Sequence, residues 1–115
     1  MMSRISTHVL DAVPGKPAVG VAVRLERHET DRRHAGRWAP VSAAETDAEG
    51  RCRKLAENAP AGRYKLTFAT LEYLKRQRRA SIFPEFAIEF DCDGEQNYHL
   101  PLLLSDNSLT TYRGI

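Results

Sequence analysis

The amino-acid sequence predicts an all-β fold, a β-sandwich of seven to eight short strands with one short helix. Most segments alternate apolar and polar residues with a period of two, the pattern of a strand with one buried face. Clusters of Pro, Gly, Asp and Asn separate these segments at short intervals. The period becomes helical in one place, after Thr70. These three observations are typical of a sandwich.

The first half of the chain contains four expected strands, at residues 5–10, 19–25, 38–46 and 51–55. The second of these is the most regular, with a core face formed by Val19, Val21, Val23 and Leu25. Turn residues at 11–17 precede it, and a polar, charged loop from Arg27 to Gly36 follows it. The segment Asp47-Ala48-Glu49-Gly50 predicts a tight turn before the fourth strand, because glycine closes it.

The second half contains the helix and four further strands, at residues 64–68, 86–90, 98–104 and 108–113. Leu71, Leu74 and Arg78 share one helical face, which predicts a helix of about two turns. Thr70 is the expected N-cap, since a hydroxyl can accept a hydrogen bond from a free N–H of the first turn. Gly94 lies in a hairpin turn between the strands at 86–90 and 98–104.

Composition predicts one soluble cytoplasmic domain spanning residues 1–115. The 17 Lys and Arg residues nearly balance the 15 Asp and Glu residues, so the overall charge does not indicate a nucleic-acid or membrane partner. The N-terminal residues lack the apolar run of a signal peptide, and no segment reaches transmembrane length. Cys52 and Cys92 lack metal-site spacing, which predicts free thiols in a reducing compartment.

The strand at 98–104 is unusual because both of its faces are largely apolar. One face is core-like, with Tyr98, Leu100, Leu102 and Leu104. The opposite face carries His99, Pro101 and Leu103, which is too apolar to lie in water. We expect a second cover for this face, from the same fold or from a partner subunit.

His8, Arg51 and His99 form the strongest candidate for chemistry. Both histidines lie on the strand face opposite the core, and imidazoles can act as general base and acid near neutral pH. A guanidinium beside them would stabilise a developing oxyanion and favour a neutral histidine. The alternative is that each histidine is an ordinary core or surface residue, because sequence spacing does not establish that the three meet in space.

Three other charged clusters have simpler interpretations. The run from Lys75 to Arg79 could bind RNA or another anion, but cations at a solvated helix end are favoured without help from a ligand. His28 and His34 lack the further ligands of a metal site. The acidic residues of the turn at 91–95 lack the later glutamate of a calcium loop.

Four segments resemble the 5-hydroxyisourate hydrolases, the transthyretin-related enzymes of urate breakdown. The opening Ser6-Thr7-His8-Val9-Leu10-Asp11 is followed by Gly15-Lys16-Pro17-Ala18, and Thr46-Asp47-Ala48-Glu49-Gly50-Arg51 resembles the turn that presents the family's arginine. Tyr98 to Ser105 resembles the second histidine motif, and Thr111-Tyr112-Arg113-Gly114 the terminal signature. The four occur in the family's order along the whole chain.

The resemblance implies a prealbumin-like (transthyretin-like) sandwich that assembles as a homotetramer, a dimer of dimers with active sites at the dimer–dimer interface. It implies hydrolysis of a cyclic amide bond of 5-hydroxyisourate, without metal or organic cofactor, to 2-oxo-4-hydroxy-4-carboxy-5-ureidoimidazoline. His8 and His99 would activate water and transfer protons, and Arg51 would orient substrate and stabilise charge. Tyr112, Arg113 and Gly114 would line the pocket, either in their own subunit or in a neighbouring one.

The sequence departs from the family pattern in three places. Ile115 stands where the family usually has serine, the segment Asp106 to Thr110 lacks the usual proline and tyrosine, and the basic loop Arg27 to Arg37 is outside the pattern. A non-catalytic carrier of the transthyretin type is the main alternative function, but it predicts that the histidines and arginine are replaced.

Overall fold

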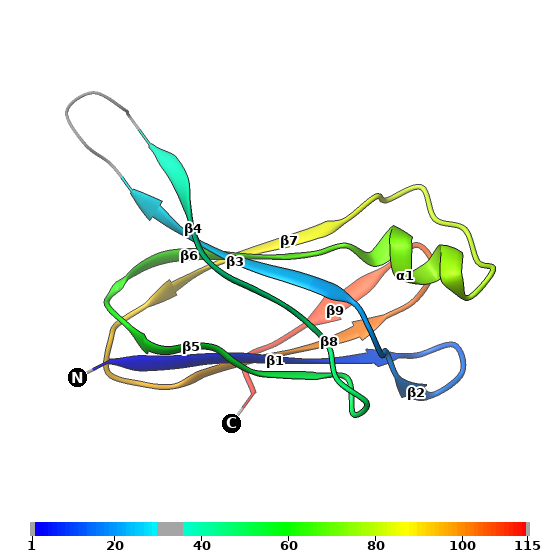
Figure 1. Cartoon of the computed structure of the whole chain (residues 1–115), viewed down its shortest axis with the longest axis horizontal. Coiled ribbons are helices and arrows are strands. Elements are labelled where there is room, and N and C mark those ends of the chain that lie inside the picture. Colours follow the sequence, from blue (N-terminus) through cyan, green and yellow to red (C-terminus); the bar gives the residue numbers. More distant parts are fainter. Residues whose placement is uncertain (1, 30–35, 115) are drawn as a thin grey trace.

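The computed structural model describes residues 2–29 and 36–114, which form two β-sheets packed face to face with one short helix at the edge (Figure 1). The β1 sheet contains β1 (Ser3–Asp11), β2 (Lys16–Pro17), β5 (Arg51–Ala59), β8 (Tyr98–Leu104) and β9 (Leu109–Thr111). The β3 sheet contains β3 (Ala22–Glu29), β4 (Arg37–Glu45), β6 (Gly62–Phe68) and β7 (Phe86–Cys92). The predicted fold class is therefore confirmed.

Strand β1 is the centre of its sheet. It pairs in parallel with β8 on one side and antiparallel with β5 and the two-residue β2 on the other. Strand β9 continues the sheet beyond β8, and the β3 sheet has the antiparallel order β4-β3-β6-β7. A segment near the start of the chain thus lies beside one near its end, as Figure 1 shows.

The space between the sheets is filled by the inward-facing residues of the alternating strands. In β1 these include Ile5, Thr7 and Val9, while Ser6, His8 and Leu10 face outward. In β8 the predicted core face is confirmed, because Tyr98, Leu100, Leu102 and Leu104 are all buried. The opposite side chain of Leu103 is 46% exposed.

The start of β3 differs from the expectation. Gly20 has a φ of +78°, a left-handed conformation that ends any extended run, so the strand begins only at Ala22. Val19 therefore lies in a turn and is exposed, whereas Val21, Val23 and Leu25 are buried as predicted. The sequence also gave no signal for β2, which extends over only two residues.

The helix α1 (Thr70–Arg76) begins at the residue that was expected to cap it. Ala69 occupies the N-cap position and makes no side-chain capping bond. The prediction that Thr70 is the N-cap is wrong, because Thr70 is fully buried and its hydroxyl has no hydrogen-bond partner among the described residues. No helix in the described part of the chain is long and apolar enough to cross a membrane.

The helix ends in a Schellman motif that places Arg79. The Arg78 N–H donates to the Lys75 carbonyl and the Arg79 N–H to the Leu74 carbonyl, with Arg78 at a left-handed φ of 59°. This reversal returns Arg79 toward the end of β1, where its guanidinium pairs with Asp11 and Asp106. The expectation of a wholly solvated basic run is therefore wrong for Arg79.

Candidate active site

The strand register brings the three predicted residues together on the outer face of the β1 sheet. His8 lies directly opposite Arg51 of β5 and opposite Pro101 of β8. Ser6, two residues before His8 on the same face, lies opposite His99. The two histidines are therefore diagonal neighbours, with Cα atoms roughly 8 Å apart for strands of ordinary spacing. The hypothesis that they are unrelated residues does not fit this register.

A hollow on this outer face is lined by all six residues that the sequence nominated. They come from β1, β5, β8 and the C-terminal tail, with Leu10 and Pro101 supplying apolar walls; the six are His8, Arg51, His99, Tyr112, Arg113 and Gly114.

Arg51 is fixed by the turn that precedes it. The Asp47 carboxylate accepts hydrogen bonds from the N–H groups of Glu49, at 2.8 Å, and of Arg51, at 2.9 Å. These hydrogen bonds from Arg51 and Glu49 lower the pKa of Asp47, so the carboxylate is ionised and accepts both bonds at neutral pH. The predicted tight turn is confirmed, and it fixes the backbone of Arg51 at the start of β5.

Gly50 could not be replaced in this turn without moving β1. Its φ is +77°, and a Cβ added there would lie 2.4 Å from the Val9 carbonyl oxygen. The Gly50 carbonyl in turn accepts a hydrogen bond from the Val9 N–H at 2.7 Å. The turn is thus attached to the backbone of β1 next to His8.

The His8 ring is held by backbone. Its Nε2 lies 2.9 Å from the Glu49 carbonyl oxygen. A carbonyl can only accept, so Nε2 must carry the proton, and in the neutral ring Nδ1 is then the proton acceptor. The turn that positions Arg51 therefore also selects the tautomer of His8.

The His99 ring is held by a hydroxyl instead. Its Nδ1 lies 2.8 Å from Ser6 Oγ, which can donate or accept. Partial burial, followed by the charges of Arg51 and His8, lowers the pKa of His99 below its usual 6.5. His99 is therefore predominantly neutral at neutral pH. Its Nε2 can act as a base whenever Ser6 accepts from Nδ1–H.

The Arg51 guanidinium is only lightly neutralised. Its one carboxylate within ion-pair distance, among the described residues, is Glu49, with Nε to Oε2 at 3.7 Å. The Nε atom is buried and makes no hydrogen bond in the described part of the chain, and the side chain is 34% exposed. Arg51 thus retains donors for an oxyanion that enters the hollow.

Gly114 contacts His99 so closely that only glycine fits. Its N–H donates to the His99 carbonyl at 2.7 Å, and an added Cβ would lie 2.8 Å from His99 Cδ2. The tail therefore packs against the edge of the His99 ring in the same chain. Tyr112, by contrast, is 63% exposed.

The Arg113 guanidinium is held by two contacts within its own chain. It lies 4.6 Å from the centre of the Tyr98 ring and donates to Gln96 Oε1 at 2.9 Å. Arg113 thus lines the hollow with its guanidinium already in contact with Tyr98 and Gln96, whereas the Nε of Arg51 has no hydrogen-bond partner among the described residues.

Two site residues escaped the sequence reasoning. Ser6 shares the outer face with His8, so its direction was available from the period of two, but its partner His99 depends on the β1–β8 pairing. The Glu49 carbonyl is a backbone group and carries no residue-type signal.

Comparison with known proteins places this geometry in a family. Residues 5–114 match the model of the HIUase/transthyretin family. The chain belongs to this family. It is 39% identical to a 5-hydroxyisourate hydrolase of Mus musculus over 97% of this chain and 95% of that protein.

The solved structures that resemble this chain include a 5-hydroxyisourate hydrolase and a transthyretin. A 5-hydroxyisourate hydrolase of Klebsiella pneumoniae matches with a TM-score of 0.85 and 37% identity, over 99% of this chain and 100% of that one. Sea bream transthyretin in complex with thyroxine matches with a TM-score of 0.88 and 30% identity, over 97% of this chain and 95% of that one.

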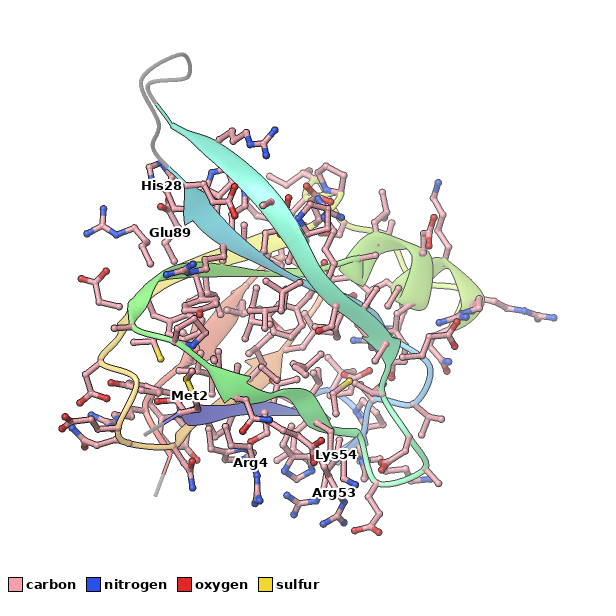
Figure 2. All side chains as sticks on the ribbon, turned by 60° about the vertical axis from the view of Figure 1, so that its left-hand side comes forward. Met2, Arg4, His28, Arg53, Lys54 and Glu89 are labelled. Carbon is pink, nitrogen blue, oxygen red and sulfur yellow. The ribbon has the colours of Figure 1, made fainter. Side chains whose placement is uncertain are left out.

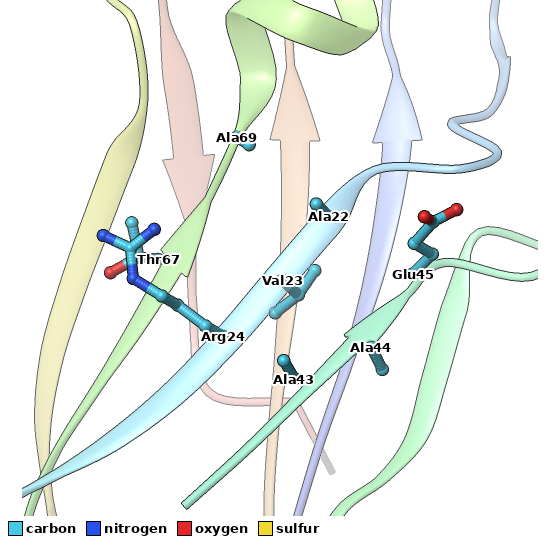
Figure 3. A pocket seen from close by; sticks show the side chains of 8 residues that line it. All are labelled: Ala22, Val23, Arg24, Ala43, Ala44, Glu45, Thr67 and Ala69. Carbon is cyan, nitrogen blue, oxygen red and sulfur yellow. The ribbon is translucent and has the colours of Figure 1, made fainter. Parts of the chain in front are cut away.

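Some features singled out in this HIUase/transthyretin chain lie elsewhere. His28 packs edge-on against Trp38 in the β3 sheet, and His34 and Ile115 are outside the described residues, as is 30–35 of the basic loop. Asp93 accepts the N–H groups of Glu95 and Gln96, as an ordinary turn acid does. A hollow on the β3 sheet is lined by four alanines and Val23, with Arg24, Glu45 and Thr67 as its polar groups (Figure 3). It contains no histidine.

Proposed function

We propose that this protein hydrolyses 5-hydroxyisourate. The observation that carries the proposal is the convergence of His8, Arg51 and His99, from three adjacent strands, on one hollow. Family membership and the relatives named 5-hydroxyisourate hydrolase support an enzyme, and they support this substrate. The location remains proposed as the cytoplasm, and the organisation as a single domain over residues 1–115.

His99 is the proposed general base. Its lowered pKa keeps the ring neutral at neutral pH, and the Ser6 hydroxyl can hold the Nδ1–H while Nε2 removes a proton from water. The hydroxide equivalent then attacks the amide carbonyl carbon of the substrate ring. The same imidazolium can return the proton to the leaving nitrogen, so the residue ends neutral.

Arg51 and His8 are proposed to stabilise the charge that develops. Attack converts the carbonyl oxygen to an oxyanion, and the incompletely paired Arg51 guanidinium can donate to it. His8 has its tautomer fixed by the Glu49 carbonyl, which leaves Nδ1 to accept a proton or orient water. Tyr112, Arg113 and Gly114 would wall the substrate site.

The reaction breaks the ring C–N bond and adds the elements of water. The carbonyl carbon gains OH and the nitrogen gains H, giving a ureido carboxylic acid that ionises near neutral pH. The product would be 2-oxo-4-hydroxy-4-carboxy-5-ureidoimidazoline. None of these steps requires a redox change, and the residues of the hollow supply all the proton transfers.

A homotetramer, with active sites at a dimer–dimer interface, is proposed as the working assembly. Leu10, Leu103 and Tyr112 are exposed around the hollow, and apolar side chains gathered on one sheet face are typical of an interface. Light scattering coupled to size exclusion should give about four times the 13.0 kDa chain mass. A monomer with full activity would contradict this assembly.

The direct test generates 5-hydroxyisourate from urate with a urate oxidase and follows its ultraviolet decay. The protein should accelerate decay over the spontaneous rate, and decay at the spontaneous rate would exclude the hydrolase. A transthyretin-type carrier is the second candidate, favoured by the likeness to the thyroxine-bound sea bream protein. Thyroxine binding without acceleration would establish the carrier instead.

A further inference from the structure

A second hollow adjoins the catalytic one and shares two residues with it. It lies on the same outer face, between β1 and β5, and Arg51 and His99 line both hollows. Its other wall residues are Arg4, Ser6, Thr7, Arg53 and Lys54. The hollow therefore extends from the catalytic pair into a strongly cationic region.

A bulge in β5 creates this cationic wall. Thr7 pairs with Cys52 and Ile5 pairs with Ala56, so three residues of β5 face the single Ser6 of β1. Regular alternation would send consecutive side chains to opposite faces, but a bulge re-aims them. Arg53 and Lys54 consequently are both exposed, and Figure 2 shows them projecting on the same side of the molecule as Arg4.

The cations of this wall outnumber the carboxylates that reach them. Arg53 lies 3.4 Å from Glu49 and Lys54 lies 3.8 Å from Glu57, both as exposed pairs of the weak kind. Arg4 has no carboxylate within ion-pair distance among the described residues. Since the whole chain carries a net charge of only +2, this positive field is local to the hollow.

We propose that Arg4, Arg53 and Lys54 form an anion subsite that binds the carboxylate released by hydrolysis. This inference rests on the proposed function, because amide hydrolysis converts a neutral carbonyl into a carboxylate within reach of Arg51. The adjoining cations would draw that carboxylate away from the His99 ring and so open the site for the next substrate. The ligand class is a small ureido carboxylate.

The test uses two probes of nearly the same size and shape, the anion ureidoacetate and its neutral amide ureidoacetamide, titrated into the protein by NMR at low ionic strength. The protein should bind ureidoacetate at least about tenfold more tightly, and 0.5 M salt should remove most of that preference because exposed charges are then screened. The variant R4Q/R53Q/K54Q should lose the preference without a change in its affinity for ureidoacetamide.

A matched variant separates local from overall charge. K16Q/R37Q/K75Q removes three exposed cations outside the hollow and should keep the preference. Equal loss in both triple variants would overturn the subsite, as would equal binding of the two probes by the unaltered protein. Carboxylate preference in a protein that does not hydrolyse 5-hydroxyisourate would support the subsite and overturn the hydrolase, whereas turnover without preference would do the reverse.

Discussion

Strand β1 carries two polar clusters, and they are built in opposite ways. At its end, Asp11 is fully buried and its carboxylate accepts from Val13 N–H, Tyr73 O–H and both terminal nitrogens of Arg79. Three residues earlier, the His8 side chain has a single hydrogen-bond partner in the described chain, the Glu49 carbonyl. In the Asp11 cluster every carboxylate oxygen accepts hydrogen bonds from within the protein. In the His8 cluster the second ring nitrogen has no such partner among the described residues, and the side chain lines a hollow.

The comparison separates stability from reactivity. Burial would raise the pKa of Asp11, but the hydrogen bonds from Arg79, Tyr73 and Val13 outweigh burial and lower that pKa. The carboxylate is therefore charged at neutral pH, with both of its oxygens already hydrogen-bonded. The same environment raises the pKa of Tyr73 to about 12. The lowered pKa of His99 instead keeps its ring neutral, and therefore able to take up a proton during a reaction.

The largest expected effect comes from disrupting the cluster around Asp11, in which Val13, Tyr73 and Arg79 donate to its carboxylate. Asp11→Ala should lower the free energy of unfolding by about 3–5 kcal/mol, because it leaves the Arg79 guanidinium partly buried without its main partner. Urea denaturation measures this loss. Asp91→Ala, which removes an exposed partner of Arg63, is the control and should have a much smaller effect. Equal losses in the two variants would show that the buried Asp11 cluster contributes no more to stability than an exposed ion pair.

The Asp11 cluster also predicts acid sensitivity. Because the folded-state pKa of Asp11 is lowered, its contribution is present above the unfolded pKa of about 3.9 and is lost as pH falls through the folded value. Asp11→Asn should therefore flatten the dependence of stability on pH below about 4. An unchanged slope would assign the acid sensitivity to other carboxylates.

Removing a residue of the His8, Arg51 and His99 cluster should lower the rate of hydrolysis and leave the free energy of unfolding almost unchanged. His99→Ala should lower kcat by about a hundredfold or more, the usual scale for losing a general base, or about 2.7 kcal/mol of barrier. His28→Ala, in the β3 sheet, should retain the rate. Stopped-flow assays on both variants make the measurement. A near-normal rate in the His99 variant would remove this residue from the mechanism.

Ser6→Ala should have a smaller effect, about a tenfold loss of kcat, because it removes one positioning hydrogen bond and leaves the ring in place. Ser6→Thr keeps the hydroxyl and should restore most of the rate. Restoration by threonine but not by alanine distinguishes a hydrogen-bonding role from packing. Loss of rate in both variants would indicate packing alone.

The smallest effect is a displacement of the pH profile. The acid limb of kcat/KM should have its midpoint below pH 6.5, since burial and then Arg51 and His8 lower the pKa of His99. Arg51→Gln removes a positive charge and should raise the midpoint by less than about one pH unit, in addition to lowering the rate. A midpoint that falls or stays fixed would contradict the assigned electrostatics.

Most of the fold followed from local patterns. Eight of the nine strands in the described chain were expected from the sequence, and a period of two predicted core faces in several of them, because side chains alternate sides of any strand. The errors lie at the left-handed Gly20, at Thr70, which is buried rather than capping, and at the turn around Gly94. The predicted hairpin there is wrong, because the segment joins β7 of one sheet to β8 of the other sheet, and these two strands do not pair. The two-residue β2 is too short to have a period.

The candidate site was predictable in composition but not in arrangement. Residue chemistry and the family resemblance nominated His8, Arg51 and His99, and the register confirms that they meet. The Ser6 hydroxyl and the Glu49 carbonyl required knowledge of which strands are neighbours. The sequence also could not show that the Arg113 guanidinium would stack on the Tyr98 ring.

The sequence by itself therefore determined which side chains share a face, because alternation is a local property of the backbone. The tertiary structure decided which faces adjoin, since pairing β1 with β8 joins residues more than ninety positions apart. It also decided that Arg79 forms an ion pair with Asp11, because the end of the helix reverses the chain. In the same way, the bulge in β5 directs both Arg53 and Lys54 toward the hollow between β1 and β5. Such contacts depend on long-range packing, which no local period encodes.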